Sequence, residues 1–177
     1  MTINLKLQML SWKKVATTKF QKNLVLSGFF FGTLIFLLGM LESYAIIHFL
    51  PPSLLGKLAS AKYFNSKPSV LSIILFAICL VPIFETFLAQ QFVIELSKKL
   101  GATPFFCGVF SASVFGLGHY INGGLAHGIT ALLSGLLLAY VYLLYREQGI
   151  GQSFIVTAFA HAINNTWVVI MSSYIEF

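Results

Sequence analysis

The stretch VPIFETFLAQQ at residues 81–91 decides the class of fold. Glu85 lies in its middle and is the only charged residue between Lys67 and Glu95, and its neighbours are apolar enough to cross a bilayer. A charged side chain at that depth costs about 2.5–3.5 kcal/mol even on insertion-based scales, so an intramembrane carboxyl indicates a functional site. The simpler interpretation is a neutral structural carboxyl that is hydrogen-bonded across helices. The choice depends on whether other segments bring polar partners to Glu85.

The composition of the whole chain is that of a membrane protein. Of its 177 residues, 58% are hydrophobic and only 9% are charged, whereas soluble domains carry about 25% charged residues. We therefore expect an all-α integral membrane protein with a single transmembrane domain at residues 24–177. The net charge of +6 comes from basic residues in the N-terminal arm and in the connections. That distribution indicates orientation in a lipid bilayer rather than binding to nucleic acid.

Apolar runs separated by polar turns predict a bundle of about five transmembrane helices. Lysines alternate with apolar residues over residues 1–23, and this basic amphipathic arm predicts a short N-terminal interfacial helix. The expected transmembrane helices cover about 24–49, 69–96, 103–120, 125–145 and 150–171.

Small residues recur at four-residue intervals in several of these expected helices. Gly28 and Gly32 form a G-x-x-x-G pair in the first, and the third and fourth carry similar stripes. Such residues let a neighbouring helix approach closely. His127 lies one turn before the stripe of the fourth helix, so we expect it to face the interior of the bundle.

The distribution of Lys and Arg predicts the orientation. With the N-terminus in the cytoplasm, eight of the eleven basic residues lie on the cytoplasmic side and three on the other side. Because cytoplasmic loops carry the excess of Lys and Arg, we expect a multi-pass protein of the cell inner (cytoplasmic) membrane with a cytoplasmic N-terminus and an external C-terminus.

Four polar residues fall at a similar depth in the bilayer. At about 1.5 Å per residue, Glu85 and His161 lie about 16 Å in from the cytoplasmic ends of their helices, and His119 and Asn165 about 22 Å. His161 and Asn165 are four residues apart and share a helix face. Three helices thus deliver a carboxyl, two imidazoles and an amide to the middle of a hydrocarbon core of about 30 Å. This convergence favours a chemical site.

These side chains suit the activation of water. A carboxylate beside an imidazole can deprotonate a water, and an imidazole with an amide N–H can stabilise the oxyanion formed when that water attacks a carbonyl. No Ser or Cys is convincingly paired with a base, so direct attack by water is preferred over an acyl-enzyme. The alternative is a zinc site with Glu85, His119 and His161 as ligands and an open fourth position, although the H-E-x-x-H signature is absent.

Three short motifs resemble, in order and spacing, those of the CAAX-protease and bacteriocin-processing (CPBP or ABI) family of intramembrane proteases. The Phe-x-x-x-His motif is complete at residues 115–119, and the His-x-x-x-Asn motif is complete at residues 161–165. The Glu-Glu-x-x-x-Arg motif is partial, because Glu85 is followed by Thr86 and Gln90 where the family has Glu and Arg. The family-like core covers about residues 70–171, the span from the second to the last expected helix.

The resemblance implies an intramembrane endopeptidase without a cofactor, acting on a membrane-associated peptide or protein. Glu85 and His119 would activate the water, while His161 and Asn165 would hold the oxyanion. Zinc is the alternative to this glutamate mechanism. A non-proteolytic protein of the same fold, acting in bacteriocin immunity or as a membrane scaffold, is the alternative from a different class.

We interpret the departure at Thr86 and Gln90 as a compensated exchange. The two positions are i and i+4, so we expect their side chains to be neighbours on one helix face and to hydrogen-bond across one turn. The positive and the negative charge of the family pattern are absent together, which leaves the net charge of that face unchanged. Glu85 therefore stays available as the base.

Overall fold

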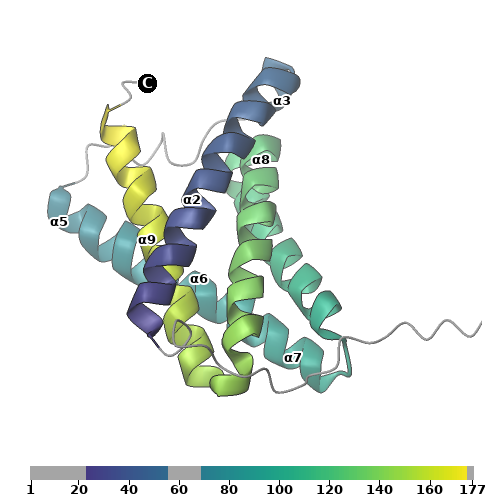
Figure 1. Cartoon of the computed structure of the whole chain (residues 1–177). Helices are drawn as coiled ribbons and strands as arrows, with labels where there is room; N and C mark the ends of the chain where they lie inside the picture. The colour runs from purple at the N-terminus through teal and green to yellow at the C-terminus, as the bar shows by residue number, and fades with distance from the viewer. Residues whose placement is uncertain (1–22, 56–68, 175–177) are drawn as a thin grey trace, which may run out of the picture.

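The computed structural model describes residues 23–55 and 69–174, and within these ranges the chain is helical and contains no strand (Figure 1). The expected all-α membrane bundle is therefore confirmed. The interfacial helix expected in the N-terminal arm lies outside the described residues. The Asn23 side chain caps the first described helix by accepting a hydrogen bond from the Leu26 N–H at 3.0 Å.

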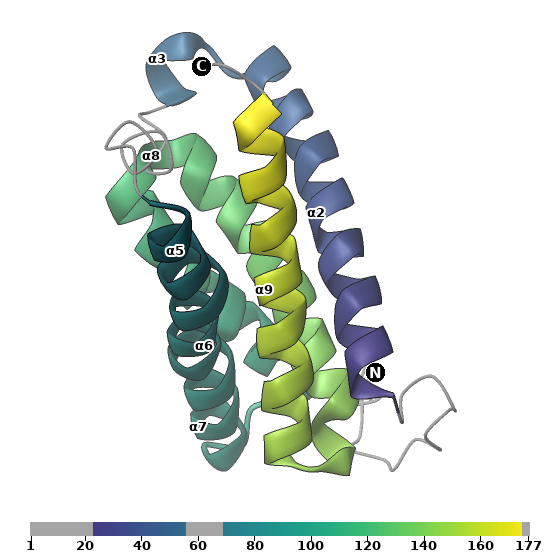
Figure 2. The same ribbon diagram turned by 90° about the vertical axis from the view of Figure 1, so that its left-hand side faces the viewer.

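Helices α2 (Leu24–Phe49) and α9 (Ile150–Tyr174) lie side by side and run in the same direction (Figures 1 and 2). Their contact depends on the predicted glycine pair, because Gly28 and Gly32 both lie against α9. A Cβ atom on Gly32 would collide with the carbonyl oxygen of Ala160. The small residues thus bring two backbones together, as the G-x-x-x-G pattern predicts.

The helix that carries Glu85 is 30 residues long, Val70–Lys99, and alternates between α-helical and π-helical segments. A π-helical hydrogen bond joins residues five apart instead of four. Pro82 has no N–H to donate and its ring crowds the preceding turn, which accounts for the loosened geometry there. The segments are, in order, α5 (Val70–Ser72), η1 (Ile73–Leu80), α6 (Val81–Glu85), η2 (Thr86–Phe92) and α7 (Val93–Lys99).

Helix α8 (Pro104–Tyr145) folds back on itself at Gly124, where the backbone has φ 81° and ψ −170°. This left-handed φ favours glycine, which has no Cβ to clash. The two halves pack antiparallel, since Gly116 in the first half lies against Leu132 in the second. They correspond to the third and fourth expected transmembrane helices, and their small residues form the contact.

Four helices of the described part are long and apolar enough to cross a membrane. They are Leu24–Phe49, Val70–Lys99, Pro104–Gln148 and Ile150–Ser172. The expected number was about five, and the difference has a local cause. Gly124 reverses the chain without separating the helical turns on its two sides, so two expected helices form one element. The chain still passes five times along the bundle, in agreement with the parallel course of α2 and α9 (Figure 2).

Three apolar clusters of described residues fill the interior, one of them formed by Val141, Tyr145 and Val156. The other two are named here after their largest aromatic members. The Phe115 cluster consists of Ile35, Ala89, Phe115, Ala131, Leu138 and Ala160. The Tyr142 cluster consists of Ile94, Cys107, Ala139 and Tyr142, with Phe154 packed against it. Each of these two clusters joins side chains from the Val70–Lys99 helix and from both halves of α8, so these elements are held in register.

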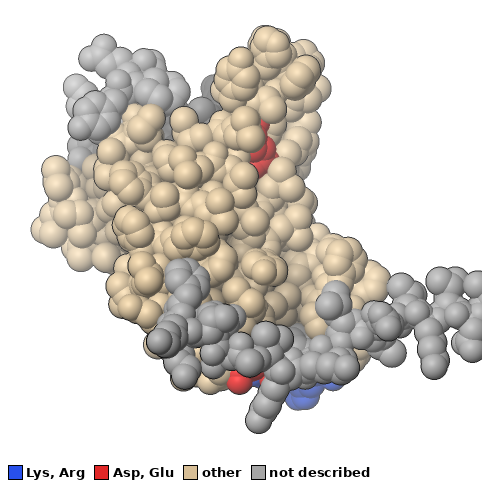
Figure 3. Space-filling view, in the orientation of Figure 1, with Lys and Arg blue, Asp and Glu red and all other residues tan. Residues whose placement is uncertain are grey.

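Most of the visible surface of the described helices is neither acidic nor basic (Figure 3). One acidic patch lies on the upper part of α2, and the visible basic atoms lie with a second acidic patch at the lower end. At that end Arg146 donates to both carboxylate oxygens of Glu95, through Nη2 at 2.8 Å and through Nε. The Tyr142 hydroxyl donates to the same carboxylate at 3.0 Å. This network ties α7 to the end of α8, next to Lys98 and Lys99. Lys98, Lys99 and Arg146, the described members of the basic set predicted to share one side of the membrane, therefore lie at the same end of the bundle.

Candidate active site

Glu85 is the last residue of α6, and two imidazoles approach its carboxylate from two other helices. Its Oε2 lies 3.5 Å from Nε2 of His161 on α9, and its Oε1 lies 3.8 Å from Nε2 of His119 on the first half of α8. The side chain of His161 is 4% exposed, while those of His119 and Glu85 are 23% and 34% exposed. The structure thus brings together three of the four predicted site residues, with the carboxylate on the more accessible side.

The hydrogen bond at Nδ1 of His119 sets the role of its other ring nitrogen. Nδ1 lies 2.8 Å from the backbone carbonyl oxygen of Phe115, which can only accept, so Nδ1 carries a proton. In the neutral ring Nε2 is then an acceptor facing Glu85. The Phe115 ring lies against both imidazoles, with ring centroids 4.4 Å from His119 and 5.5 Å from His161. This packing gives a physical reason for the Phe-x-x-x-His spacing.

His161 is held in the opposite state by Thr86. The Thr86 hydroxyl lies 3.4 Å from Nδ1 of His161 and has no other hydrogen-bond partner among the described residues. The hydroxyl donates its hydrogen bond to Nδ1, which is therefore the unprotonated ring nitrogen. Nε2 of the neutral ring then carries the ring proton and faces Glu85. Thr86 is therefore a site residue that the sequence did not identify, although its place beside Glu85 in the first motif was a signal.

The predicted hydrogen bond between Thr86 and Gln90 is not formed, and that prediction was wrong. Both residues are fully buried, but the Gln90 amide has no hydrogen-bond partner within the described part of the chain. The reason is that the Thr86 hydroxyl faces Nδ1 of His161 on α9 instead of the Gln90 amide.

Asn165 lies one turn beyond His161 on α9, and its contacts lead away from Glu85. Its Nδ2 donates to the carbonyl oxygen of Ala77 in η1 at 2.9 Å, and its Oδ1 accepts from Asn164 at 3.3 Å. The structure therefore places Asn165 beside the cluster without a hydrogen bond to it. An amide nitrogen has two N–H bonds, and the bond to Ala77 uses one of them.

His127 joins the site from the second half of α8. Its ring centroid lies 5.0 Å from that of His119, so the expected inward orientation is confirmed. A Cβ on Gly123 would collide with the His127 ring, so the ring lies directly against the backbone at the turn of the hairpin. The sequence signal for His127 was its position relative to the small-residue stripe, but nothing in the sequence paired it with His119.

The arrangement of these side chains bears on the zinc alternative. Within the described residues, no group of three or more His, Cys, Asp or Glu side chains is arranged to hold a metal ion. The described geometry instead pairs each imidazole with one oxygen of Glu85. Zinc ligation by Glu85, His119 and His161 stays an alternative for experiment.

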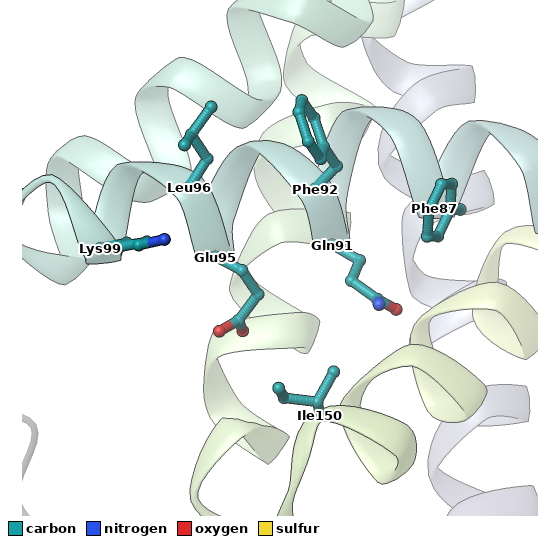
Figure 4. Close-up of a pocket in the computed structure, with 7 residues that line it drawn as sticks. All are labelled: Phe87, Gln91, Phe92, Glu95, Leu96, Lys99 and Ile150. Carbon is teal, nitrogen blue, oxygen red and sulfur yellow. The ribbon is translucent and has the colours of Figure 1, made fainter.

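A groove of about 350 Å³ lies away from the cluster, between the Val70–Lys99 helix and the start of α9 (Figure 4). It is lined by Phe87, Gln91, Phe92, Glu95, Leu96, Lys99 and Ile150. Glu95 is already paired with Arg146, so its carboxylate is not an unpaired base in this groove. The groove carries none of the predicted catalytic side chains.

Fold and site together define the class of the protein. It is a multi-pass helical membrane protein in which three helices bring a carboxyl and two imidazoles together among transmembrane segments. Comparison with protein families then gives a match over residues 67–167 to the type II CAAX prenyl endopeptidase Rce1-like family. The chain belongs to this family, and the expected family is confirmed. Comparisons with curated proteins and with solved structures find no match.

Membership of this family indicates protease activity in general. The matched residues contain Glu85 and both complete motifs. Members of such a family are intramembrane endopeptidases of the CAAX-protease type, which act on peptide or protein substrates.

Proposed function

We propose that this protein is an intramembrane endopeptidase that hydrolyses a peptide bond of a membrane-associated peptide or protein by means of water activated by Glu85 and His119. The observation that carries the proposal is the approach of two imidazoles to the two oxygens of one carboxylate inside a helical bundle. The two imidazoles are in different hydrogen-bonding states, which suits them to different roles.

The first step uses the Glu85–His119 pair. Glu85 Oε1 and His119 Nε2 are both acceptors and lie 3.8 Å apart, so one water can donate to both with hydrogen bonds of about 2.8 Å. Glu85 takes a proton from this water while its oxygen bonds to the carbonyl carbon of the substrate. General-base catalysis of this kind contributes about 10²–10⁴-fold to the rate.

The second step uses the His161–Asn165 face of α9. The Nε2–H of His161 donates to the oxyanion of the tetrahedral intermediate, and the second N–H of Asn165 is placed one turn further along the same face. When the C–N bond breaks, Glu85 returns its proton to the leaving amine. The products are a carboxyl and an amine, and the enzyme regains its starting protonation.

The direct test is peptide cleavage by purified protein in lipid vesicles. The probes are a farnesylated CAAX peptide and a non-prenylated transmembrane peptide, so the substrate class is read at the same time. Glu85→Gln, His119→Ala and His161→Ala are each expected to abolish cleavage while the protein still elutes as a folded species. Asn165→Ala is expected to lose about 10²–10³-fold, as for one oxyanion donor. Full activity of Glu85→Gln would show that Glu85 is not the base.

A second test separates the glutamate mechanism from the zinc mechanism. We expect no stoichiometric metal and no loss of cleavage after exhaustive chelation, because Glu85, His119 and His161 already account for water activation and oxyanion binding. One bound zinc per chain, with activity that disappears on chelation and returns on adding zinc, would favour a metalloprotease. Metal content is measured by mass spectrometry on the same samples.

A non-proteolytic role remains the second candidate function, and Thr86 and Gln90 are the observation that favours it. At these positions the chain lacks the Glu and Arg of the CPBP pattern. A bacteriocin-immunity or scaffold protein would keep its cellular effect when Glu85 is replaced by Gln. An endopeptidase would lose that effect.

A further inference from the structure

Several buried side-chain polar groups have no hydrogen-bond partner among the described residues, and three of them lie close to the candidate active site along their helices. These three are the amide of Gln90 and the hydroxyls of Ser111 and Thr157, each with 0% exposure. They come from three different elements: η2, the first half of α8, and α9. Buried polar groups in proteins are nearly always hydrogen-bonded to protein or water, so three such groups need a physical account.

The two apolar clusters place these side chains at one level. On η2 and α7, Gln90 lies between Ala89 of the Phe115 cluster and Ile94 of the Tyr142 cluster. On α8, Ser111 lies midway between Cys107 of the Tyr142 cluster and Phe115 itself.

Thr157 takes the same place on α9. It lies between Phe154, which packs on the Tyr142 cluster, and Ala160 of the Phe115 cluster. The three polar side chains, called here the polar layer, are therefore enclosed between two apolar clusters.

The polar layer is one helical turn from the candidate active site on all three elements. Gln90 follows Thr86 by four residues, and Thr157 precedes His161 by four. Ser111 precedes Phe115 by four, and the Phe115 ring contacts both catalytic imidazoles. The layer lies on the side of the cluster towards the Glu95–Arg146 network.

Burial limits what such a layer can bind. An apolar cluster on each side and complete burial of the side chains leave no path for a peptide or a lipid chain. Water is small enough, and a buried water needs two to four polar partners. One amide and two hydroxyls offer both donors and acceptors in that number.

We infer that Gln90, Ser111 and Thr157 form an internal water-binding site directly beneath the Glu85–His119–His161 cluster. If the proposed hydrolytic function holds, this site stores water next to the residues that activate it, inside a membrane that otherwise excludes water. The hydration itself does not depend on catalysis, so it can be tested separately.

The first test compares thermal stability in detergent. Thr157→Val removes a hydroxyl with almost no change in shape. If the layer holds water, this substitution removes one of the hydrogen-bond partners of that water, and Tm is expected to fall by about 2–4 °C. Thr157→Ser keeps the hydroxyl, so its Tm should fall less than that of Thr157→Val. Thr130→Val is the matched control, because the Thr130 hydroxyl bonds within its own helix to Ala126 and His127. A rise in Tm for Thr157→Val would mean a dry layer and would overturn the inference.

The second test detects the water directly by hydroxyl-radical footprinting with X-ray radiolysis, in which radicals form from bound water in place. The reporters are Cys107 and Phe115, which flank the layer and are 0% and 5% exposed. We expect both to be labelled in the wild type and at least fivefold less in Gln90→Leu/Thr157→Val. Tyr145, equally buried in a different cluster, should not change between the two proteins.

The outcomes of the footprinting experiment separate the two proposals. No labelling of the reporters in the wild type, or unchanged labelling in the double variant, would overturn the water-binding site. Labelling that falls as expected in a protein that cleaves no peptide would support the site and count against the proposed function. Reduced labelling together with a lower kcat and an unchanged KM would support both.

Discussion

The two histidines beside Glu85, His119 and His161, differ in which ring nitrogen carries the proton, because their hydrogen-bond partners differ. His119 donates a hydrogen bond from Nδ1–H to the Phe115 carbonyl oxygen, so its Nε2 is an acceptor that faces the carboxylate. His161 accepts a hydrogen bond at Nδ1 from the Thr86 hydroxyl, so its Nε2 carries the ring proton and is a donor. In the proposed mechanism, Glu85 Oε1 with Nε2 of His119 would therefore act as the base, and Nε2–H of His161 would act as the oxyanion donor. This division of roles follows from hydrogen bonds rather than from residue identity.

Thr86 is accordingly expected to act as a positioning residue for His161. Thr86→Val removes the hydroxyl that fixes the Nδ1 lone pair and lets the ring adopt the other tautomer. The loss of one buried hydrogen bond of about 1–1.5 kcal/mol predicts a fall in kcat of about 5–10-fold. KM should not change. Thr86→Ser keeps the hydroxyl and should retain most activity. The measurement is steady-state cleavage in vesicles, and equal losses for Val and Ser would contradict the positioning role.

Thr86 and Gln90, interpreted from the sequence as a compensated pair, do not bond to each other in the structure. The two side chains are both buried, as expected for partners on one face, but Thr86 pairs with His161 and Gln90 belongs to the polar layer. A sequence can show that two charges are absent together. It cannot show that the Thr86 hydroxyl faces His161 on another helix, because residue spacing along one helix does not give its packing against the others.

At the scale of the elements, small residues correctly predicted where helices pack closely. Gly28 and Gly32 predicted a close helix partner, and α9 is that partner. The stripes in the two halves of α8 predicted close packing, and the halves pack on each other through Gly116 and Leu132. A glycine at a contact reports where a backbone must come near. It does not name the partner, so the pairing of α2 with α9 needed the structure.

The hairpin turn of α8 provides a prediction at this scale. Gly124 has φ 81°, and a residue with a Cβ is strained there by about 1–3 kcal/mol. Gly124→Ala is therefore expected to lower thermal stability in detergent and to reduce cleavage, because His127 and His119 lie on either side of the turn. Gly118→Ala is the matched control. Gly118 is helical with no atom within 4 Å of an added Cβ, so alanine there should be neutral or stabilising by up to about 1 kcal/mol. Equal effects of the two substitutions would show that the turn is not strained.

At the scale of the whole molecule, the fold class was predicted from composition, and the convergence of the site residues was predicted from their depth along the helices. The low charge content indicated a membrane bundle, and counting residues along each helix placed Glu85, His119 and His161 at similar depths. In the structure Nε2 of each histidine lies within 3.8 Å of a Glu85 carboxylate oxygen. Counting along separate helices cannot give rotation about each axis. For that reason the contact of Asn165 with Ala77 and of His127 with His119 could not be read from the sequence.

The orientation in the membrane is the last prediction and rests on charge and topology together. Lys98, Lys99 and Arg146 lie at one end of the bundle, the end from which α2 and α9 both start (Figures 1 and 3). Five passes place the two ends of the described bundle on opposite sides. With the excess of Lys and Arg in the cytoplasm, a reporter fused after Phe177 should be external.

The control for this prediction is a second fusion at Gly149, in the turn before α9, which should report the cytoplasm. The measurement is the paired activity of alkaline phosphatase, which works outside, and of a fluorescent protein, which works inside. An external reporter at Gly149 and a cytoplasmic one after Phe177 would invert the molecule and place the Glu95–Arg146 network at the outer surface. Two reporters on the same side would mean that α9 does not cross. His161 would then lie outside the bilayer core, and the site built on Glu85 would lose its intramembrane setting.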